Sequence, residues 1–172
     1  MNVRTAEPIA PLTNNLFIQG GVMHTRRTNI RGIIFRDGEL LVTKFKQDDG
    51  SESDHWGTFG GGLDIGESIT DGLHREMIEE TGIAPEIGKL LFIQQFDDGE
   101  KEHCELFFHI KNHQDYEAVD LEATTHGALE MTRSAFVDPA KENVLPAFLQ
   151  TIDIQAYIND EKEVFLYSEL SK

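Results

Sequence analysis

The segment Gly61–Ile83, GGLDIGESITDGLHREMIEETGI, decides how this chain folds, because it holds a helix together with both of its ends. Ser68 is suited to cap a helix N-terminus, and Asp71 follows it at the spacing of a capping motif. Gly82 stands where a helix C-terminus favours a residue in the left-handed conformation. The spacing therefore predicts a helix over residues 69–81, with sharp boundaries.

The predicted helix carries three glutamates on one side. At about 100° per residue, Glu76, Glu79 and Glu80 fall within a third of its circumference. A Glu-rich helix face is ordinarily just solvated. Here, however, the apolar residues Ile69, Leu73 and Met77 project into the same sector as Glu76 and Glu80, which is the sector expected to face the core. We therefore expect that these carboxylates are not all freely solvated.

Carboxylates crowded against apolar surface repel one another unless a cation neutralises them. An oxygen-only ligand set points to a hard cation, with Mg²⁺ expected first and Mn²⁺ second. Zinc is disfavoured, because the chain has a single cysteine and no pair of histidines at ligand spacing. Mg²⁺ keeps coordination positions open for phosphate oxygens, and the glycines at 60–62 allow the backbone to approach the ion or a phosphate closely.

The same segment resembles the signature of the Nudix hydrolases. That signature reads G, five residues, E, seven residues, then R-E-apolar-x-E-E-x-G-apolar. This chain satisfies every fixed position, with Gly61, Glu67, Arg75, Glu76, Met77, Glu79, Glu80, Gly82 and Ile83.

The resemblance implies an α/β fold, an α/β/α sandwich with a mixed β-sheet, in which a loop, a helix and a second loop form the catalytic element. It implies that Glu76, Glu79 and Glu80 bind the metal and carry catalysis. Gly60 would add its backbone carbonyl as a metal ligand, and Glu67 would pair with Arg75. The residues expected to support the site structurally are Gly61, Glu67, Arg75 and Gly82.

The resemblance also implies the activity: Mg²⁺-dependent attack of water on a diphosphate bond in a nucleotide, or in a nucleoside diphosphate linked to another moiety. Glu76 is our preferred general base, with an acidic residue outside the signature as the alternative. A second hypothesis is a regulatory module that binds a nucleotide without cleaving it. An isomerase ranks last, because its candidate residue Cys104 has no supporting motif.

Many Nudix hydrolases use one further carboxylate on the metal, downstream of the signature. This chain offers four, at Glu102, Glu105, Glu122 and Glu130. We prefer Glu122, because it precedes residues 126–131, a stretch that resembles a family strand. Glu105, in the middle of a predicted strand, is the second choice.

Candidate substrate contacts lie before the signature. Arg26, Arg27 and Arg31 stand out in an acidic protein, and guanidinium groups suit phosphate or sugar oxygens, although surface ion pairs are an alternative role. Phe59 is the fourth candidate, at a position where the family commonly has proline.

The rest of the chain predicts strands that alternate with helices. The Asp37-Gly38 turn favours a hairpin. Two further strands flank a turn at residues 97–99, and residues 46–55 read as a polar loop. The expected strands are 31–35, 39–45, 89–96, 102–110 and 164–167, and a helix is expected over 146–157.

Composition limits the function classes. The 172 residues, 39% apolar and 27% charged, fit one folded domain. A net charge of −16 argues against nucleic-acid binding, and no apolar run suits a membrane span. We expect an N-terminal arm over 1–24, a Nudix domain over 25–172, a cytoplasmic location and a small nucleotide-type substrate. A homodimer through the apolar residues 16–18 is a further expectation.

Overall fold

The computed structural model describes residues 17–19 and 22–170. Its main body contains two four-stranded sheets and few helices, which confirms the predicted α/β class. The first sheet has the order β10-β7-β8-β3, and in the second β5 pairs with β4 and β6 on one edge and with β9 on the other. The strands are β3 (Arg26–Ile33), β4 (Phe35–Arg36), β5 (Glu39–Lys46), β6 (Glu52–Gly57), β7 (Ile87–Asp97), β8 (Glu102–Ile110), β9 (Met131–Val137) and β10 (Phe165–Ser168).

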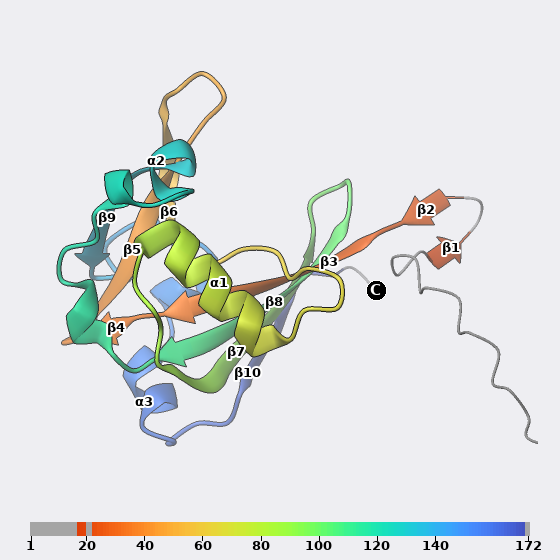
Figure 1. The fold of residues 1–172 in the computed structure, drawn as a ribbon. Coiled ribbons are helices and arrows are strands. Elements are labelled where there is room, and N and C mark those ends of the chain that lie inside the picture. The colour runs from red at the N-terminus through yellow and green to blue at the C-terminus, as the bar shows by residue number, and fades with distance from the viewer. Residues whose placement is uncertain (1–16, 20–21, 171–172) are drawn as a thin grey trace, which may run out of the picture.

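The first sheet is mixed, as predicted. Strands β7 and β8 are antiparallel neighbours, whereas β3 runs parallel to β8 and β10 runs parallel to β7. The helical elements are α1 (Ile69–Thr81), α2 (Gly127–Glu130), α3 (Ile154–Ile158) and the 3₁₀ turns His113–Tyr116, Leu121–Ala123 and Ala147–Gln150. In Figure 1, α1 lies across the strands as the longest helix of the body.

Helix α1 has the bounds that its sequence predicts. The Ser68 hydroxyl accepts a hydrogen bond from the Asp71 amide at 3.1 Å. At the other end Gly82 has φ of 73°, and its amide donates to the Ile78 carbonyl at 2.9 Å. Both ends satisfy backbone groups that would otherwise lack partners, so the helix begins and ends sharply.

The core has two parts, one on each face of the sheets. Along β5, Leu40 and Val42 belong to one hydrophobic cluster, and Leu41 belongs to the other, as expected for a strand buried on both faces. The first cluster includes Ile154 of α3, and the second includes Leu73 and Met77 of α1. Helices thus cover both faces, which confirms the predicted sandwich.

Most predicted strands are confirmed, including the hairpin at Asp37-Gly38, whose residues have φ of 49° and 86°. The expected loop over 46–55 is partly wrong, because β6 begins at Glu52, where Arg133 of β9 pairs with it across the sheet. The expected helix over 146–157 is two short pieces, because Asp153 caps a separate helix by accepting from the Ala156 amide.

The expected N-terminal arm lies largely outside the described residues. Strands β1 (Phe17–Gln19) and β2 (Val22–His24) form a short antiparallel pair before β3. The division at residue 24 and the homodimer stay predictions. In the part of the chain that the structure describes, no helix combines the length and apolar character that crossing a membrane requires.

Packing of α1 against the sheet leads to a prediction. Leu73 is fully buried, whereas Ile78, on the same helix, is 40% exposed. We expect Leu73→Ala to lower the free energy of unfolding by about 2–5 kcal/mol, because it leaves a cavity under the helix. Ile78→Ala, the matched control, should cost about 1 kcal/mol or less. Urea unfolding of both variants checks this, and equal losses would contradict the packing described.

Candidate active site

Helix α1 buries two of its three signature glutamates against the core. Glu76 and Glu80 are only 8% and 4% exposed, while Glu79 is partly exposed. Glu76 and Glu80 lie on the side of the helix that also buries Leu73 and Met77, as the periodicity predicts, whereas Ile69, expected in the same sector, is 39% exposed. A buried carboxylate is costly unless it is paired, neutralised or hydrogen-bonded. The surroundings of each glutamate therefore decide what the site can do.

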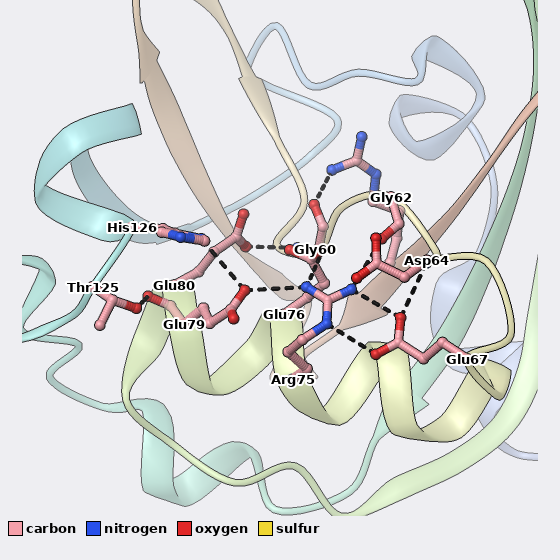
Figure 2. Close-up of polar contacts among 11 residues, drawn as sticks. Gly60, Gly62, Asp64, Glu67, Arg75, Glu76, Glu79, Glu80, Thr125 and His126 are labelled. Atoms are coloured by element: carbon pink, nitrogen blue, oxygen red, sulfur yellow. Dashed lines mark hydrogen bonds and ion pairs between the residues drawn. The ribbon is translucent and has the colours of Figure 1, made fainter.

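Arg75 binds three carboxylates at once (Figure 2). Its Nε and one terminal nitrogen donate to the two oxygens of Glu67, both at 2.9 Å. The other terminal nitrogen donates to Glu76 at 2.8 Å and to Glu79 at 3.1 Å. The terminal nitrogen that donates to Glu67 also donates to the Gly62 carbonyl at 3.1 Å. These contacts raise the pKa of Arg75, and the bond to Glu67 is the largest cause.

Glu67 ties the loop before α1 to the helix. The bidentate contact with Arg75 lowers the pKa of Glu67 to about 2, and the Asp64 amide, which donates to the same carboxylate at 3.1 Å, contributes further. The carboxylate is therefore charged at every physiological pH. Glu67 and Arg75 thus lie in contact, as we expect of an ion pair that holds the loop against the helix.

Glu80 is neutralised in a different way. Its Oε2 accepts a hydrogen bond from the Gly60 amide at 2.7 Å. The pKa of Glu80 is nevertheless raised to about 8. Burial is the largest cause, and the nearby carboxylates of Glu76 and Glu130 contribute to the rise. Without a bound cation, this carboxyl group is protonated at neutral pH.

The glycine loop before α1 is attached to strand β3. The Ile30 amide donates to the Gly61 carbonyl and the Gly32 amide to the Phe59 carbonyl, both at 2.9 Å, and the Leu63 amide donates to Thr28 at 3.0 Å. The loop therefore runs beside β3 like a further strand and is held by backbone bonds at alternate positions.

Two glycines of this loop are required by close approach. Gly60 has φ of 117°, and a Cβ there would lie 2.2 Å from the Ile30 carbonyl oxygen. At Gly61 a Cβ would lie 2.5 Å from a carboxylate oxygen of Glu76. The absence of side chains thus lets the backbone lie directly against the buried carboxylate. In this structure the Gly60 carbonyl, an expected metal ligand, accepts a hydrogen bond from Arg31.

Strands β3 and β8 supply a second polar network opposite α1. The Glu105 Oε1 accepts bonds from Arg31 at 3.1 and 3.2 Å and from Asn29 at 3.2 Å. The Asn29 side chain also lies 3.3 Å from His103 Nδ1, and His103 Nε2 lies 2.7 Å from Asp98. Asn29 and Glu105 are register partners across the parallel strands, which explains their contact.

The two networks enclose one polar cavity of about 400 Å³. Glycine backbone forms one part of its wall, and four carboxylates contribute to the lining. The lining residues are Arg27, Asn29, Arg31, Phe45, Gly60, Gly61, Gly62, Glu76, Glu80, Phe96, His103, Glu105, His126 and Glu130. Its volume falls within the range of small-molecule sites.

The downstream carboxylates are arranged differently from the prediction. Glu122 is exposed on a 3₁₀ turn and does not line the cavity, because residues 127–130 form helix α2 where a strand was expected. Glu105 and Glu130 do line it. Glu130 also lies close enough to Glu80 to raise the pKa of that group. The structure therefore favours Glu105 or Glu130 over Glu122 as an additional ligand.

The predicted substrate contacts divide into three groups. Arg27 and Arg31 line the cavity with the carboxylates. Arg26 instead pairs with Glu102 at 2.8 Å, as an ordinary ion pair would, and lines a neighbouring pocket. Phe59 corrects the prediction, because it is fully buried in the cluster beneath α1, and its ring is not available to a substrate.

Three residues that line the cavity, Asn29, His103 and His126, escaped the sequence analysis. His126 Nδ1 lies 3.4 Å from Glu79, and Thr125 and His126 both donate to the Glu79 carbonyl (Figure 2). Thr125 and Glu79 are 46 positions apart, and nothing in the sequence alone indicates that they lie in contact. For Asn29 a signal did exist, since polar residues at alternate positions 27, 29 and 31 of a strand indicate one polar face.

The residues present suit a hard divalent cation by their chemistry. Glu76 and Glu80 offer buried carboxylate oxygens, and burial, which raises the pKa of Glu80, disfavours its charged form unless a cation neutralises it. Within residues 17–19 and 22–170, no three acidic, histidine or cysteine side chains already surround one point. Arg75 holds Glu76 and Glu79 instead, so these contacts would have to rearrange for both to bind one ion.

A model of the NUDIX domain matches residues 25–150 of this chain, which include both polar networks and the cavity between them. The chain belongs to the Nudix family. The loop 60–67 and helix α1 carry the residues of the Nudix signature, among them Glu67, Arg75 and Glu76, which are joined by the contacts described above. The match begins at the residue before β3 and ends within the 3₁₀ turn Ala147–Gln150.

Known relatives support this assignment. The nucleoside triphosphatase NudI of Escherichia fergusonii is 40% identical over 57 residues, which are 33% of this chain and 40% of that protein. The MutT protein of Methanosarcina mazei Go1 has a similar structure, with a TM-score of 0.61 and 20% identity over 81% of this chain and 98% of that chain. The E. coli ORF135 protein has a TM-score of 0.58 and 20% identity, over 80% and 92% of the two chains. The two structures show a shared fold.

The raised pKa of Glu80 predicts a pH-dependent stability. Because the folded protein keeps this proton up to about pH 8, while an unfolded glutamate loses it near pH 4.5, its contribution is present below pH 4.5 and is lost as the pH rises towards 8. We expect the free energy of unfolding to fall over this window by on the order of 4 kcal/mol relative to Glu80→Gln. Denaturant titrations without divalent cations at several pH values check this, and parallel curves would contradict it.

The contact between Gly61 and Glu76 predicts a specific defect. In Gly61→Ala the new methyl group would lie within 2.8 Å of both Glu76 oxygens, so the carboxylate must move. We expect Mg²⁺ affinity, measured by calorimetry, to fall about tenfold.

The matched control is Gly50→Ala, at a glycine with φ of 79° and open space around it. Strain there should lower stability by about 1 kcal/mol and leave Mg²⁺ affinity unchanged. Equal Mg²⁺ affinity in both variants would contradict the role of Gly61.

Proposed function

We propose that this chain is a Mg²⁺-dependent pyrophosphohydrolase, with Mn²⁺ as a possible substitute, that cleaves a diphosphate bond in a nucleotide or in a nucleoside diphosphate linked to another moiety. The observation that carries the proposal is the cavity lined by Glu76, Glu80, Glu105 and Glu130 together with the glycines 60–62. Family membership supports the reaction class. The relative NudI is named as a nucleoside triphosphatase, which supports a nucleotide substrate.

In this proposal Glu76, Glu79 and Glu80 hold the ion, and Gly60 adds its carbonyl oxygen once Arg31 releases it. The bound ion supplies positive charge that offsets the negative charge developing on the phosphoryl oxygens. Glu80 must lose its proton before it binds the cation, because burial keeps it protonated at neutral pH. Mg²⁺ affinity is therefore coupled to pH through this residue.

Arg27 and Arg31 are the basic groups that line the cavity, and we assign them to the substrate phosphates. Arg27 lies over Gly62, and no ion-pair partner for it occurs among the described side chains. Arg31 is held by Glu105 and so has a fixed position. A guanidinium already fixed in place loses little freedom when it binds a phosphate oxygen.

Glu76 is our proposed general base, which takes a proton from the attacking water. Its Oε1 is held by Arg75, and its Oε2 lies beside the Gly61 backbone. Such fixed orientation is what proton transfer requires. Glu105 and Glu130 are the acidic residues outside the signature that reach the same cavity, and each could serve instead.

A substrate screen tests the proposal. The protein is incubated in Mg²⁺ with nucleoside triphosphates, ADP-ribose, nucleotide sugars and dinucleoside polyphosphates, and the products are identified. Cleavage of a diphosphate bond in at least one of them is expected. Tight nucleotide binding without hydrolysis in either Mg²⁺ or Mn²⁺ would instead favour the regulatory module considered from the sequence.

Substitution of the signature glutamates makes a sharper prediction. Glu79→Gln or Glu80→Gln should lower kcat by at least about 100-fold, because the ion loses a charged ligand, while circular dichroism shows an intact fold. Glu122→Gln is the matched control, since that glutamate is exposed outside the cavity, and it should retain wild-type kcat. Unchanged turnover in both signature variants would overturn the metal assignment.

A further inference from the structure

A second cavity adjoins the carboxylate cavity, and the function proposed above does not use it. Its volume is about 360 Å³. The two cavities share Arg31, Phe45, Phe96 and Glu105 in their walls, so they form neighbouring parts of one groove. Phosphates held at the carboxylates would leave the rest of the substrate beside this second space.

The second cavity contains a buried polar group without a partner. Gln94 lines it and is only 6% exposed. Its Oε1 has no hydrogen-bond partner among the residues that the structure describes. A buried amide oxygen without a partner costs about 1–3 kcal/mol. Such a group is therefore expected to have a role that compensates for its cost.

The surroundings of Gln94 are suited to a flat ring. Phe96 lies in the wall of both cavities, and its ring stacks on His103 with 4.6 Å between centroids and 5° between planes. That stack holds the Phe96 ring in a defined orientation. Phe45 provides a second aromatic side chain to the same cavity. Aromatic walls with one convergent amide resemble the composition of small-molecule sites in general.

The strand geometry explains why Gln94 faces the site. Gln94 pairs with Glu105 across β7 and β8. Register partners point to the same side of a sheet. Gln94 and the carboxylate that holds Arg31 therefore lie side by side, whereas the adjacent Gln95 points to the opposite face.

We propose that this second cavity binds the base of the nucleotide substrate and that Gln94 determines specificity by accepting a hydrogen bond from a ring or exocyclic N–H of that base. The inference rests on the proposed function, since it requires a substrate whose phosphates lie at the carboxylates. A nucleobase satisfies the unpartnered amide oxygen and places its ring along Phe96.

The test compares Gln94→Met with Gln95→Met. Substrates are ATP, GTP, CTP and UTP, with inorganic tripolyphosphate as a probe that has phosphates and no base. For the preferred nucleotide, Gln94→Met should raise KM about three- to tenfold and leave kcat within twofold, because the base contact is remote from the reacting atoms. KM for tripolyphosphate should not change, and Gln95→Met should match the wild type throughout.

Thermal unfolding separates recognition from a structural role. Methionine is close in size to glutamine and removes an unpartnered acceptor, so Gln94→Met should keep or raise the unfolding midpoint. A lower midpoint with unchanged KM would show that Gln94 serves the fold and would overturn the proposal. An equal rise in KM for tripolyphosphate would overturn it as well, since the effect would then not concern the base.

The two proposals fail in distinguishable ways. If the wild type cleaves a nucleotide but Gln94→Met has the same KM, the base site is wrong and the hydrolase proposal stands. If the wild type cleaves none of the probes, the hydrolase proposal fails for them, and the Kd values of the same nucleotides from calorimetry replace KM. The same three- to tenfold weakening then supports the base site, and its absence overturns it.

Discussion

The structure depends on the placement of acidic side chains on the buried face of one helix. If both were charged and unpartnered, Glu76 and Glu80 would repel each other, and burying their charges beside the apolar core would cost desolvation free energy. The molecule relieves this in two ways, since Arg75 neutralises Glu76 and a retained proton neutralises Glu80. A divalent cation would be a third way, and it would require Arg75 to release Glu76 and Glu80 to lose its proton. The site is thus arranged so that folding tolerates the carboxylates, and the proposed cation would change their protonation and their partners.

Local sequence predicted those parts of the fold whose determinants lie close together in the chain. The helix over 69–81 follows from its cap residues, and the hairpin at Asp37-Gly38 follows from its turn. The prediction failed where a distant partner decides. Glu52 looks like a loop residue, but it pairs with Lys46 of strand β5, and Arg133 of β9 forms an ion pair with its side chain. Glu122 was preferred over Glu105 as a further metal ligand, and the sequence does not reveal that residues 127–130 form helix α2 or that Glu105 and Glu130 line the cavity.

In the candidate site, too, the contacts that are local in sequence could be predicted and those between distant segments could not. Every contact that Arg75 makes to a carboxylate joins it to a residue within eight positions, and the signature spacing anticipates the bond to Glu67. The opposite wall is built from β3 and β8, whose register brings Asn29 and Glu105 together across 76 positions. Phe59 illustrates the reverse error, since nearness to the glycines in sequence suggested exposure to substrate, and the fold buries it completely.

The pairing of the loop 59–63 with β3 has a consequence for how this scaffold can vary. A loop held by backbone bonds at Phe59, Gly61 and Leu63 behaves as part of the sheet, so the amides that donate these bonds, those of Ile30, Gly32 and Leu63, should exchange with solvent as slowly as those of a true strand. These backbone bonds involve none of Phe45, Gln94 and Phe96, which line the second cavity. Substitutions at those three positions can therefore accumulate without disturbing the loop that holds the carboxylates, and one chemistry can serve many differently shaped molecules.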